Sequence, residues 1–228
     1  MTPERFQRIT AVLNKRQPDL TVITDEVHKG RNLSAITRTC DAVGIDTMHC
    51  VMPEDGYQTY SGTSASAEKW VAMQHHSSIS TPVNDLKRQG FQLVAANLGD
   101  NTVDYRSVDY TKPTALVLGA EVKGVSLEAA AAVDFNVTVP MVGMVESFNV
   151  SVAAAIILME AQHQRQQAGL YDQPRLTAAV YRARFFRWAH PVLAQWCDDN
   201  GVEYPPVRED GEVENLSAWF KAEQARLE

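Results

Sequence analysis

Short apolar runs alternate with longer segments of helical periodicity between residues 20 and 167 of this chain. Strands that alternate with helices pack as a parallel sheet covered by helices on both faces. The alternation therefore predicts an α/β fold. Runs typical of strands occupy 20–23, 48–51, 70–75, 91–96, 115–118 and 135–139. Helical segments occupy 32–43, 80–89, a stretch from Ser126 and 149–167. A Gly/Ser/Thr-rich loop occupies 54–66.

The two ends of the chain lack strand patterns. Thr2 and Pro3 form a good helix start, and an amphipathic segment follows them. After residue 169 the pattern is helical only and is interrupted by prolines. We expect an N-terminal helix in residues 1–18, a core in 19–168 and a helical extension in 169–228.

The composition indicates a globular protein of a reducing compartment. Hydrophobic residues make up 45% and charged residues 21%, which is ordinary for a folded domain. The three cysteines are widely spaced, which predicts free thiols and neither a disulfide framework nor a zinc site. His75-His76 is a lone pair that favours a surface or packing role over metal binding. The N-terminus lacks a signal core, and the longest apolar run, 152–159, is too short for a bilayer. We expect a cytoplasmic protein with no metal and no membrane partner.

The positive charges are unevenly distributed, although the net charge is −7. Local basic patches can bind phosphate backbones whatever the total charge of the protein. Taken alone, the same residues are also typical of solvated helix faces. The candidates for contact with RNA phosphates are Arg5, Arg8, Lys15, Arg16 and Arg165.

Two strand-to-turn segments, 116–124 and 139–151, predict a ligand site. Each is an apolar run that enters a turn and then delivers polar residues near a helix start. Ligands of open α/β sheets bind outside the carboxyl ends of the strands. Gly119 and Gly124 have the glycine spacing of a phosphate-binding loop, but Val125-Ser126 stands where such a loop has Lys-Ser/Thr, and no G-x-G-x-x-G occurs. The ligand is therefore not held as ATP or NAD usually is.

Three segments, 32–38, 116–124 and 139–153, together resemble the motifs of the SPOUT (knotted) RNA methyltransferases. Segments 16–22, 26–29 and 103–106 extend the resemblance to the branch that methylates the ribose 2′-hydroxyl of guanosine 18 in the tRNA D-loop. The resemblance implies a parallel sheet whose C-terminal part forms a deep trefoil knot, and a homodimer with sites near the subunit interface. It also implies tRNA as substrate and S-adenosylmethionine as methyl donor.

The resemblance assigns donor contacts to the ends of three strands and to the third motif. Small or apolar residues there let the main chain approach an adenine ring closely. Ala96 stands where the family often has Thr, and Phe148 where it often has Leu. The expected donor contacts are Ala96, Asn97, Leu118, Gly119, Val139, Met141 and Phe148.

The resemblance assigns the chemistry to Arg38, Asn32, Glu121, Ser147 and Asn149. Arg38 is interpreted as a phosphate clamp that stabilises developing charge, because a guanidinium stays protonated and is a poor base. Without the resemblance it is a surface arginine of a helix.

Each of the other four residues also has a structural interpretation. Asn32 could cap its helix. Glu121 could bond Asn32 or main chain and shape the donor pocket, or be a solvated loop acid. Ser147 and Asn149 are candidate caps of the last core helix that could also contact the target guanosine.

Two rival functions remain open at this point. The first is a related enzyme that acts on ribosomal RNA or on another tRNA position. The second is a catalytically idle RNA-binding module on the same scaffold. Cysteine is absent from all three motifs, which disfavours a covalent thiol route and favours direct methyl displacement.

Overall fold

A computed structural model describes residues 1–52, 67–97, 101–121 and 123–227. These residues form two compact units. One is Gln17–Gln173, and the other joins Met1–Arg16 to Pro174–Glu228. The loop predicted at 54–66 lies outside the described residues.

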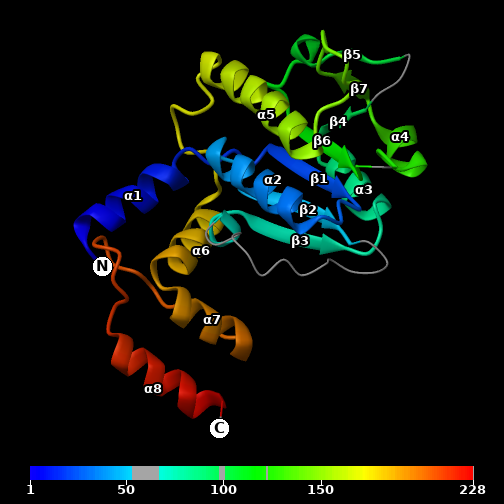
Figure 1. Cartoon of the computed structure of the whole chain (residues 1–228). Helices are drawn as coiled ribbons and strands as arrows, with labels where there is room; N and C mark the ends of the chain where they lie inside the picture. The colour runs from blue at the N-terminus through cyan, green and yellow to red at the C-terminus, as the bar shows by residue number, and fades with distance from the viewer. Residues whose placement is uncertain (53–66, 98–100, 122, 228) are drawn as a thin grey trace. The chain divides into compact units, whose positions relative to one another are not determined.

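The larger unit is built on a sheet in which every described pairing is parallel. This confirms the predicted parallel α/β fold (Figure 1). The strand that the sequence did not predict is β5, which has two residues and no apolar run. In sheet order the strands are β3 (Ala72–His76), β2 (Thr47–Val51), β1 (Leu20–Asp25), β6 (Thr114–Gly119), β4 (Gln92–Ala96), β7 (Phe135–Thr138) and β5 (Val103–Asp104).

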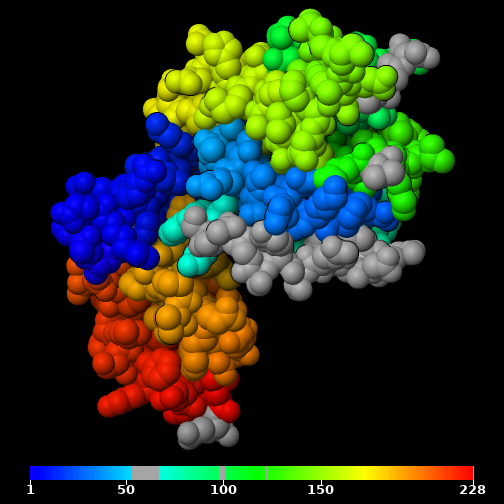
Figure 2. Space-filling model, in the orientation of Figure 1, coloured from blue at the N-terminus to red at the C-terminus, as the bar shows by residue number. Residues whose placement is uncertain are grey.

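Helices cover both faces of this sheet, as predicted. Helices α2 (Gly30–Ala42) and α5 (Val150–Gln167) lie on one face, where they pack on alternate strand residues such as Val22 and Leu116. Their surfaces adjoin in Figure 2. Helices α3 (Ser80–Arg88) and α4 (Leu127–Ala132) pack on the other face, against Ile23 and Val117. Both faces are therefore buried, which explains the continuous apolar strands. Two short 3₁₀ turns, η1 (Ala67–Lys69) and η2 (Tyr105–Ser107), complete the unit.

The carboxyl ends of the central strands are aligned. Asp25 at the end of β1 is opposite Gly119 at the end of β6, and Ala96 at the end of β4 is opposite Leu118. Because these strands are parallel and in register, the turns that follow them emerge at the same edge of the sheet. This alignment brings together segments that lie far apart in the sequence.

In the larger unit, side-chain caps fix the starts of two α-helices. Asn149 caps α5 by accepting a hydrogen bond of 2.9 Å from the Ser151 amide, and Ser126 caps α4. Asn149 rather than Ser147 is therefore the cap at the start of α5. The cap of α2 is Lys29, and Asn32 lies inside that helix. The interpretation of Asn32 as a helix cap is wrong, because the helix begins two residues before it.

The smaller unit contains the terminal helices. Thr2 caps α1 (Pro3–Leu13), as its sequence predicts. Within this unit the Phe6 ring packs edge-on against Phe185, with 5.6 Å between centroids. The other helices are α6 (Ala178–Ala189), α7 (Pro191–Asn200) and α8 (Leu216–Leu227). Among the described residues of the whole chain, no helix is both long enough and apolar enough to cross a membrane.

Candidate ligand site at the carboxyl edge of the sheet

A cavity of about 550 Å³ lies where the turns after β4, β6 and β7 meet the start of α5. This volume is in the range of small-molecule sites. Its walls combine apolar residues such as Val137 and Ile157 with polar residues such as Asn97, Glu121 and Glu146. The two segments that predicted a ligand site therefore contribute to a single cavity.

Most residues predicted to contact a donor line this cavity. Ala96, Asn97, Gly119, Val139 and Phe148 are all part of its wall. The remaining two, Leu118 and Met141, are not. Leu118 is fully buried and its side chain belongs to the core beneath α2 and α5. Leu118 thus packs beneath the lining residues Val137 and Ile157, which belong to the same core cluster.

The turn after β6 depends on close approach of its two glycines. A Cβ on Gly119 would lie 2.1 Å from the carbonyl carbon of Gly124. Gly124 has a φ of 68°, which favours glycine, and its amide donates a 2.7 Å bond to the Ala120 carbonyl. The spacing of the two glycines thus allows the turn to close tightly, and the closed turn brings main-chain atoms to the cavity wall.

A chain of hydrogen bonds connects the three motif segments. Asn32 donates from its side-chain amide to one carboxylate oxygen of Glu121, which is one of the alternatives that the sequence left open for Glu121. The side-chain amide of Asn149 donates to the side-chain oxygen of Asn32 at 3.3 Å. Lys29 forms an ion pair with the other oxygen of Glu121. Glu121 and Asn149 line the cavity, and Asn32 connects them from behind.

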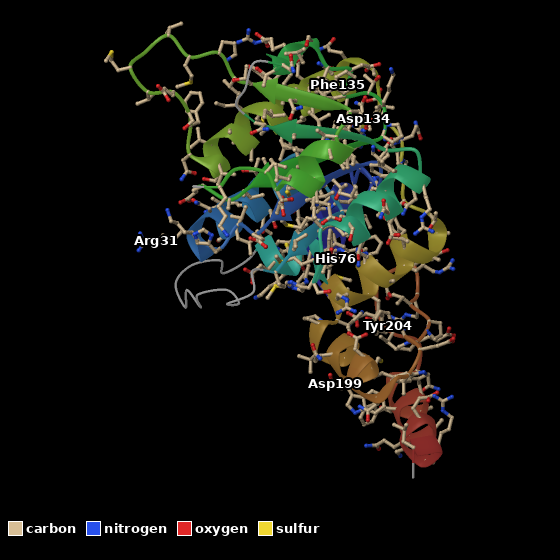
Figure 3. The ribbon with its side chains drawn as sticks, turned by 90° about the vertical axis from the view of Figure 1, so that its right-hand side faces the viewer. Arg31, His76, Asp134, Phe135, Asp199 and Tyr204 are labelled. Carbon is tan, nitrogen blue, oxygen red and sulfur yellow. The ribbon has the colours of Figure 1, made fainter. Side chains whose placement is uncertain are left out.

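Ser147 and Arg38 differ in their relation to the cavity. Ser147 is exposed and lines the wall. Arg38 is exposed on α2 and is not part of the lining. It follows Asn32 by six residues, which is about 9 Å along a helix axis. Arg31, near the start of the same helix, extends outward in Figure 3. The exposed side of α2 thus carries two arginines.

The predicted RNA contacts divide by exposure. Arg5, Arg8 and Lys15 are exposed, and Arg5 also donates a 2.9 Å bond to the Trp188 carbonyl within the smaller unit. Arg16 is fully buried, with its guanidinium carbon 5.0 Å from the centroid of the Trp188 ring.

Arg165 is fully buried as well and forms an interior hydrogen-bond network. It donates to main-chain oxygens of Tyr110, Asp19 and Lys112 and to the side chains of Gln17 and Asp19. Burial of Arg16 and Arg165 conflicts with the predicted contact to RNA phosphates, and we do not retain that role for them. The sequence predicted that both arginines lie on the surface. Only the tertiary structure shows the partners that enclose a buried arginine.

Sequence reasoning missed several residues of this edge. Ala153 and Ile157 of α5 line the cavity, but in the sequence they are ordinary positions of an apolar helix. Asp25 is 3% exposed and accepts a 2.8 Å bond from the Ser126 amide. Its position just after the predicted strand 20–23 was the sequence feature that could have identified it. Lys29 lay inside a segment quoted for the resemblance, with no role assigned to it.

Metal binding has no support among the described residues, where no three His, Cys, Asp or Glu side chains gather suitably. His76 stacks on His49 with 5.2 Å between ring centroids, and a nitrogen–nitrogen contact of 3.0 Å joins the two rings. Burial, with help from the charge of His76, lowers the pKa of His49 to about 4. His76 is thus in a packed pair, while the described part of the chain offers that pair no third ligand.

The fold and the cavity define a parallel α/β protein that binds a small ligand through turns at the carboxyl edge of its sheet. Residues 19–159 match the SpoU rRNA Methylase family, and residues 163–216 match the family of SpoU rRNA methylase C-terminal segments. The chain belongs to the SpoU methylase family, which confirms the resemblance seen in its motifs.

Its relatives are similar over nearly their whole length. The chain is 44% identical over 227 residues to the tRNA (guanosine(18)-2′-O)-methyltransferase of Escherichia coli, covering 99% of each protein. It is 50% identical over 195 residues to the enzyme of that name from Thermus thermophilus, covering 86% of this chain and 96% of that one. The crystal structure of the A. aeolicus TrmH/SpoU tRNA modifying enzyme superposes with a TM-score of 0.75 at 38% identity, covering 88% of this chain and 98% of that one.

Proposed function

We propose that this protein is a tRNA (guanosine(18)-2′-O)-methyltransferase that uses S-adenosylmethionine as methyl donor. The observation that carries the proposal is the meeting of all three motif segments at one cavity, through Asn32, Glu121 and Asn149. The Escherichia coli relative that carries this enzyme name matches 99% of the chain. The function therefore rests on both the site and the family.

The cavity suits the donor in size and in chemistry. Small residues at Ala96 and Gly119 and apolar ones at Val139 and Phe148 offer a surface for a flat purine. The acids Glu121 and Glu146 are available to the positively charged end of such a molecule. When bound, S-adenosylmethionine supplies a methyl group on a positively charged sulfur. The protein then has to align the ribose oxygen with that methyl and exclude water.

Roles for the polar residues follow from where they lie. Ser147 and Asn149 line the cavity, and in this proposal they hydrogen-bond the guanosine nucleotide. Arg38, exposed on α2, would clamp an RNA phosphate with its planar fork and stabilise charge that develops on the ribose oxygen. It remains protonated and therefore does not itself take the proton.

We propose that Arg5 and Arg8 on α1, and Lys15 just after it, contact the phosphates of tRNA. All three are exposed, and such contacts fix the position of the RNA without reading its sequence. In this proposal residues 1–18 hold the tRNA, residues 19–168 carry out methyl transfer, and residues 169–228 form a helical extension.

We also propose that the protein acts as a homodimer. The segment before α5 exposes large apolar side chains, with Val142 at 105% and Met144 at 99% of full exposure. Val145, Phe148, Val152 and Met159 extend this exposed apolar set onto α5. Apolar surface of this kind favours burial in an interface. Light scattering after gel filtration tests the oligomeric state. We expect a dimer, and Met144→Glu should shift the protein toward the monomer.

Two further expectations belong to the same proposal. A C-terminal trefoil knot is supported by β7, which lies between β4 and β5, and by α5, whose Gln164 bonds the Val108 carbonyl at 3.1 Å. A cytoplasmic location is supported by three buried free thiols, Cys40, Cys50 and Cys197, since cysteines of the cytosol are kept reduced.

The function is tested by nucleoside mapping. Purified protein is incubated with a tRNA transcript and isotopically labelled S-adenosylmethionine, and the digested RNA is analysed by mass spectrometry. We expect label on the ribose of guanosine 18 and none on a transcript in which that nucleotide is replaced. Label on another nucleotide, or on a ribosomal RNA fragment alone, would identify a different substrate. Binding of tRNA without any label transfer would identify an idle RNA-binding module.

A further inference from the structure

The segment that follows β1 contacts the turn that follows β6 at three points. Asp25 accepts a 2.8 Å hydrogen bond from the Ser126 amide. Glu26 lies 4.0 Å from the Lys123 ammonium, and the Lys29 ammonium forms an ion pair with Glu121. The described residues of the turn after β6, several of which line the cavity, are thus held from outside by a neighbouring strand end.

The backbone of this segment is itself unusual. Glu26 has a φ of 54°, a left-handed conformation that is uncommon for residues other than glycine. Such conformations persist only where the surroundings hold them. On one side of Glu26 is the buried Asp25, and on the other is Val27, which is 1% exposed. The chain is therefore anchored on both sides of the bend that leads to Lys29.

Lys29 contributes more to orientation than to overall stability. Its side chain is 60% exposed, and exposed ion pairs stabilise a fold very little. Its partner Glu121 is only 16% exposed and receives Lys29 on one oxygen and Asn32 on the other. Two donors on two oxygens fix the plane of the carboxylate. That carboxylate is in the cavity wall, so its orientation matters for a ligand.

We infer that Lys29 is a positioning residue for donor binding: it holds Glu121, and through Glu121 the turn after β6, in the orientation that accepts the donor. Asp25 assists by holding the far end of the same turn. The identity of the ligand in this inference rests on the proposed function. Without Lys29, Glu121 keeps a single neutral donor, Asn32, and its carboxylate is free to rotate. Donor binding then weakens, while chemistry at saturating donor changes less.

The test measures binding of S-adenosylmethionine and of its demethylated product, S-adenosylhomocysteine, to the full chain by calorimetry. We expect Lys29→Gln to raise both dissociation constants about fivefold. Lys29→Arg should restore them, because arginine keeps the positive charge that forms the ion pair with Glu121. In steady-state assays the KM for donor should rise and kcat should stay within about twofold. Adding Lys29→Gln to Glu121→Gln should cause no further loss, since the partner is already neutral.

Two variants complete the design. Asp25→Asn keeps the shape of the buried side chain but not its charge, and should weaken donor binding in the same direction. The control is Lys112→Gln: the Lys112 side chain is 66% exposed, and its ammonium lies 3.8 Å from Asp109, outside the cavity. It should leave donor affinity unchanged. Melting temperatures of the Lys29 and Lys112 variants should match that of the wild type.

The outcomes separate the inference from the function on which it rests. A wild-type protein that binds neither molecule would overturn both. A wild type that binds both, with unchanged affinity in Lys29→Gln, would overturn the role of Lys29 and leave the function intact. A loss in Lys29→Gln that Lys29→Arg does not repair, or that follows a lower melting temperature, would also overturn it.

Discussion

The side-chain amide of Asn149 donates a 3.3 Å hydrogen bond to the side-chain oxygen of Asn32, 117 positions earlier in the sequence. Asn149 caps α5, and Asn32 lies in the first turn of α2 and is 8% exposed. Asn32 also donates to Glu121 in the turn after β6. One buried amide therefore connects the two helices of one face to the turn that forms the cavity wall.

Gly119→Ala should abolish most donor binding. The added methyl would lie 2.1 Å from the Gly124 carbonyl carbon, a main-chain atom that cannot move aside without opening the turn. Overpacking of this kind costs about 1–3 kcal/mol of folding free energy, so the melting temperature should fall as well. Calorimetry and thermal unfolding measure the two effects. Gly143→Ala is the matched control, because nothing lies within 4 Å of its new methyl. Normal donor affinity in Gly119→Ala would contradict the role of the turn.

Arg38→Lys should reduce methyl transfer by about tenfold or more, because lysine lacks the bidentate fork that clamps a phosphate. Donor affinity should stay unchanged, since Arg38 lies outside the cavity lining. Single-turnover rates and calorimetry measure the two quantities. Arg88→Lys, an exposed arginine on α3, is the control and should retain full activity. Near-normal turnover in Arg38→Lys would remove Arg38 from the chemistry.

The double variant Arg8→Ala, Lys15→Ala should weaken tRNA binding and leave donor affinity unchanged. Both side chains are exposed, and each phosphate contact contributes about 0.7–0.9 to the slope of log affinity against log salt. The slope should therefore fall by about one to two units. Binding titrations at several salt concentrations measure it, and an unchanged slope would exclude both residues from the interface.

Arg16→Ala should behave differently from its neighbours on the chain. Its guanidinium is fully buried against Trp188, so truncation removes packing from the interior of the smaller unit. We expect a lower melting temperature and an unchanged salt dependence of tRNA binding. A stable Arg16→Ala protein with a reduced salt slope would restore the original interpretation of Arg16 as an RNA contact.

Arg165→Met should destabilise the larger unit by about 3–5 kcal/mol, the typical effect of breaking a buried charged pair. The variant removes the 2.7 Å ion pair with Asp19 and the hydrogen bonds that Arg165 donates to the carbonyls of Tyr110 and Lys112. Urea unfolding measures the free energy. Lys112→Met, at a 66% exposed side chain, should change it by no more than about 0.5 kcal/mol. Equal stability of the two variants would contradict a structural role for Arg165.

His49 should make the protein sensitive to acid. Burial first, and the charge of His76 second, lower its pKa from 6.5 to about 4, while Asp85 opposes the shift. Because the folded pKa is depressed, the unfolded chain takes up the proton at higher pH. The stability that neutral His49 contributes is complete above about pH 6.5 and is lost as the pH falls toward about 4.

The check for His49 is urea unfolding at two pH values. Between about pH 7.5 and about pH 5, wild type should lose about 2 kcal/mol through this group, and His49→Gln should lose correspondingly less. If both proteins lose the same stability over this interval, His49 is not the group responsible.

The sequence by itself determined the class of fold and much of the cavity. The pattern of apolar residues along a strand is a local property of the sequence, so the apolar runs predicted six of the described strands. The alternation of these runs with helical segments predicted their parallel arrangement. The requirement for glycine at 119 and 124 is also local, because it follows from a tight turn after a strand. The family motifs added the bond between Asn32 and Glu121 as one alternative, because residues of the same motif set belong to one site.

Tertiary structure decided which charges are free and which are structural. Arg8 and Arg16 belong to the same basic stretch, yet one is exposed and the other is enclosed by Trp188. Arg165 is surrounded by carbonyls from segments more than 50 residues away. Lys29 finds Glu121 only because β1 and β6 are adjacent and in register. Such partners come from strand order and burial, which depend on the packing of the whole chain and not on any local pattern.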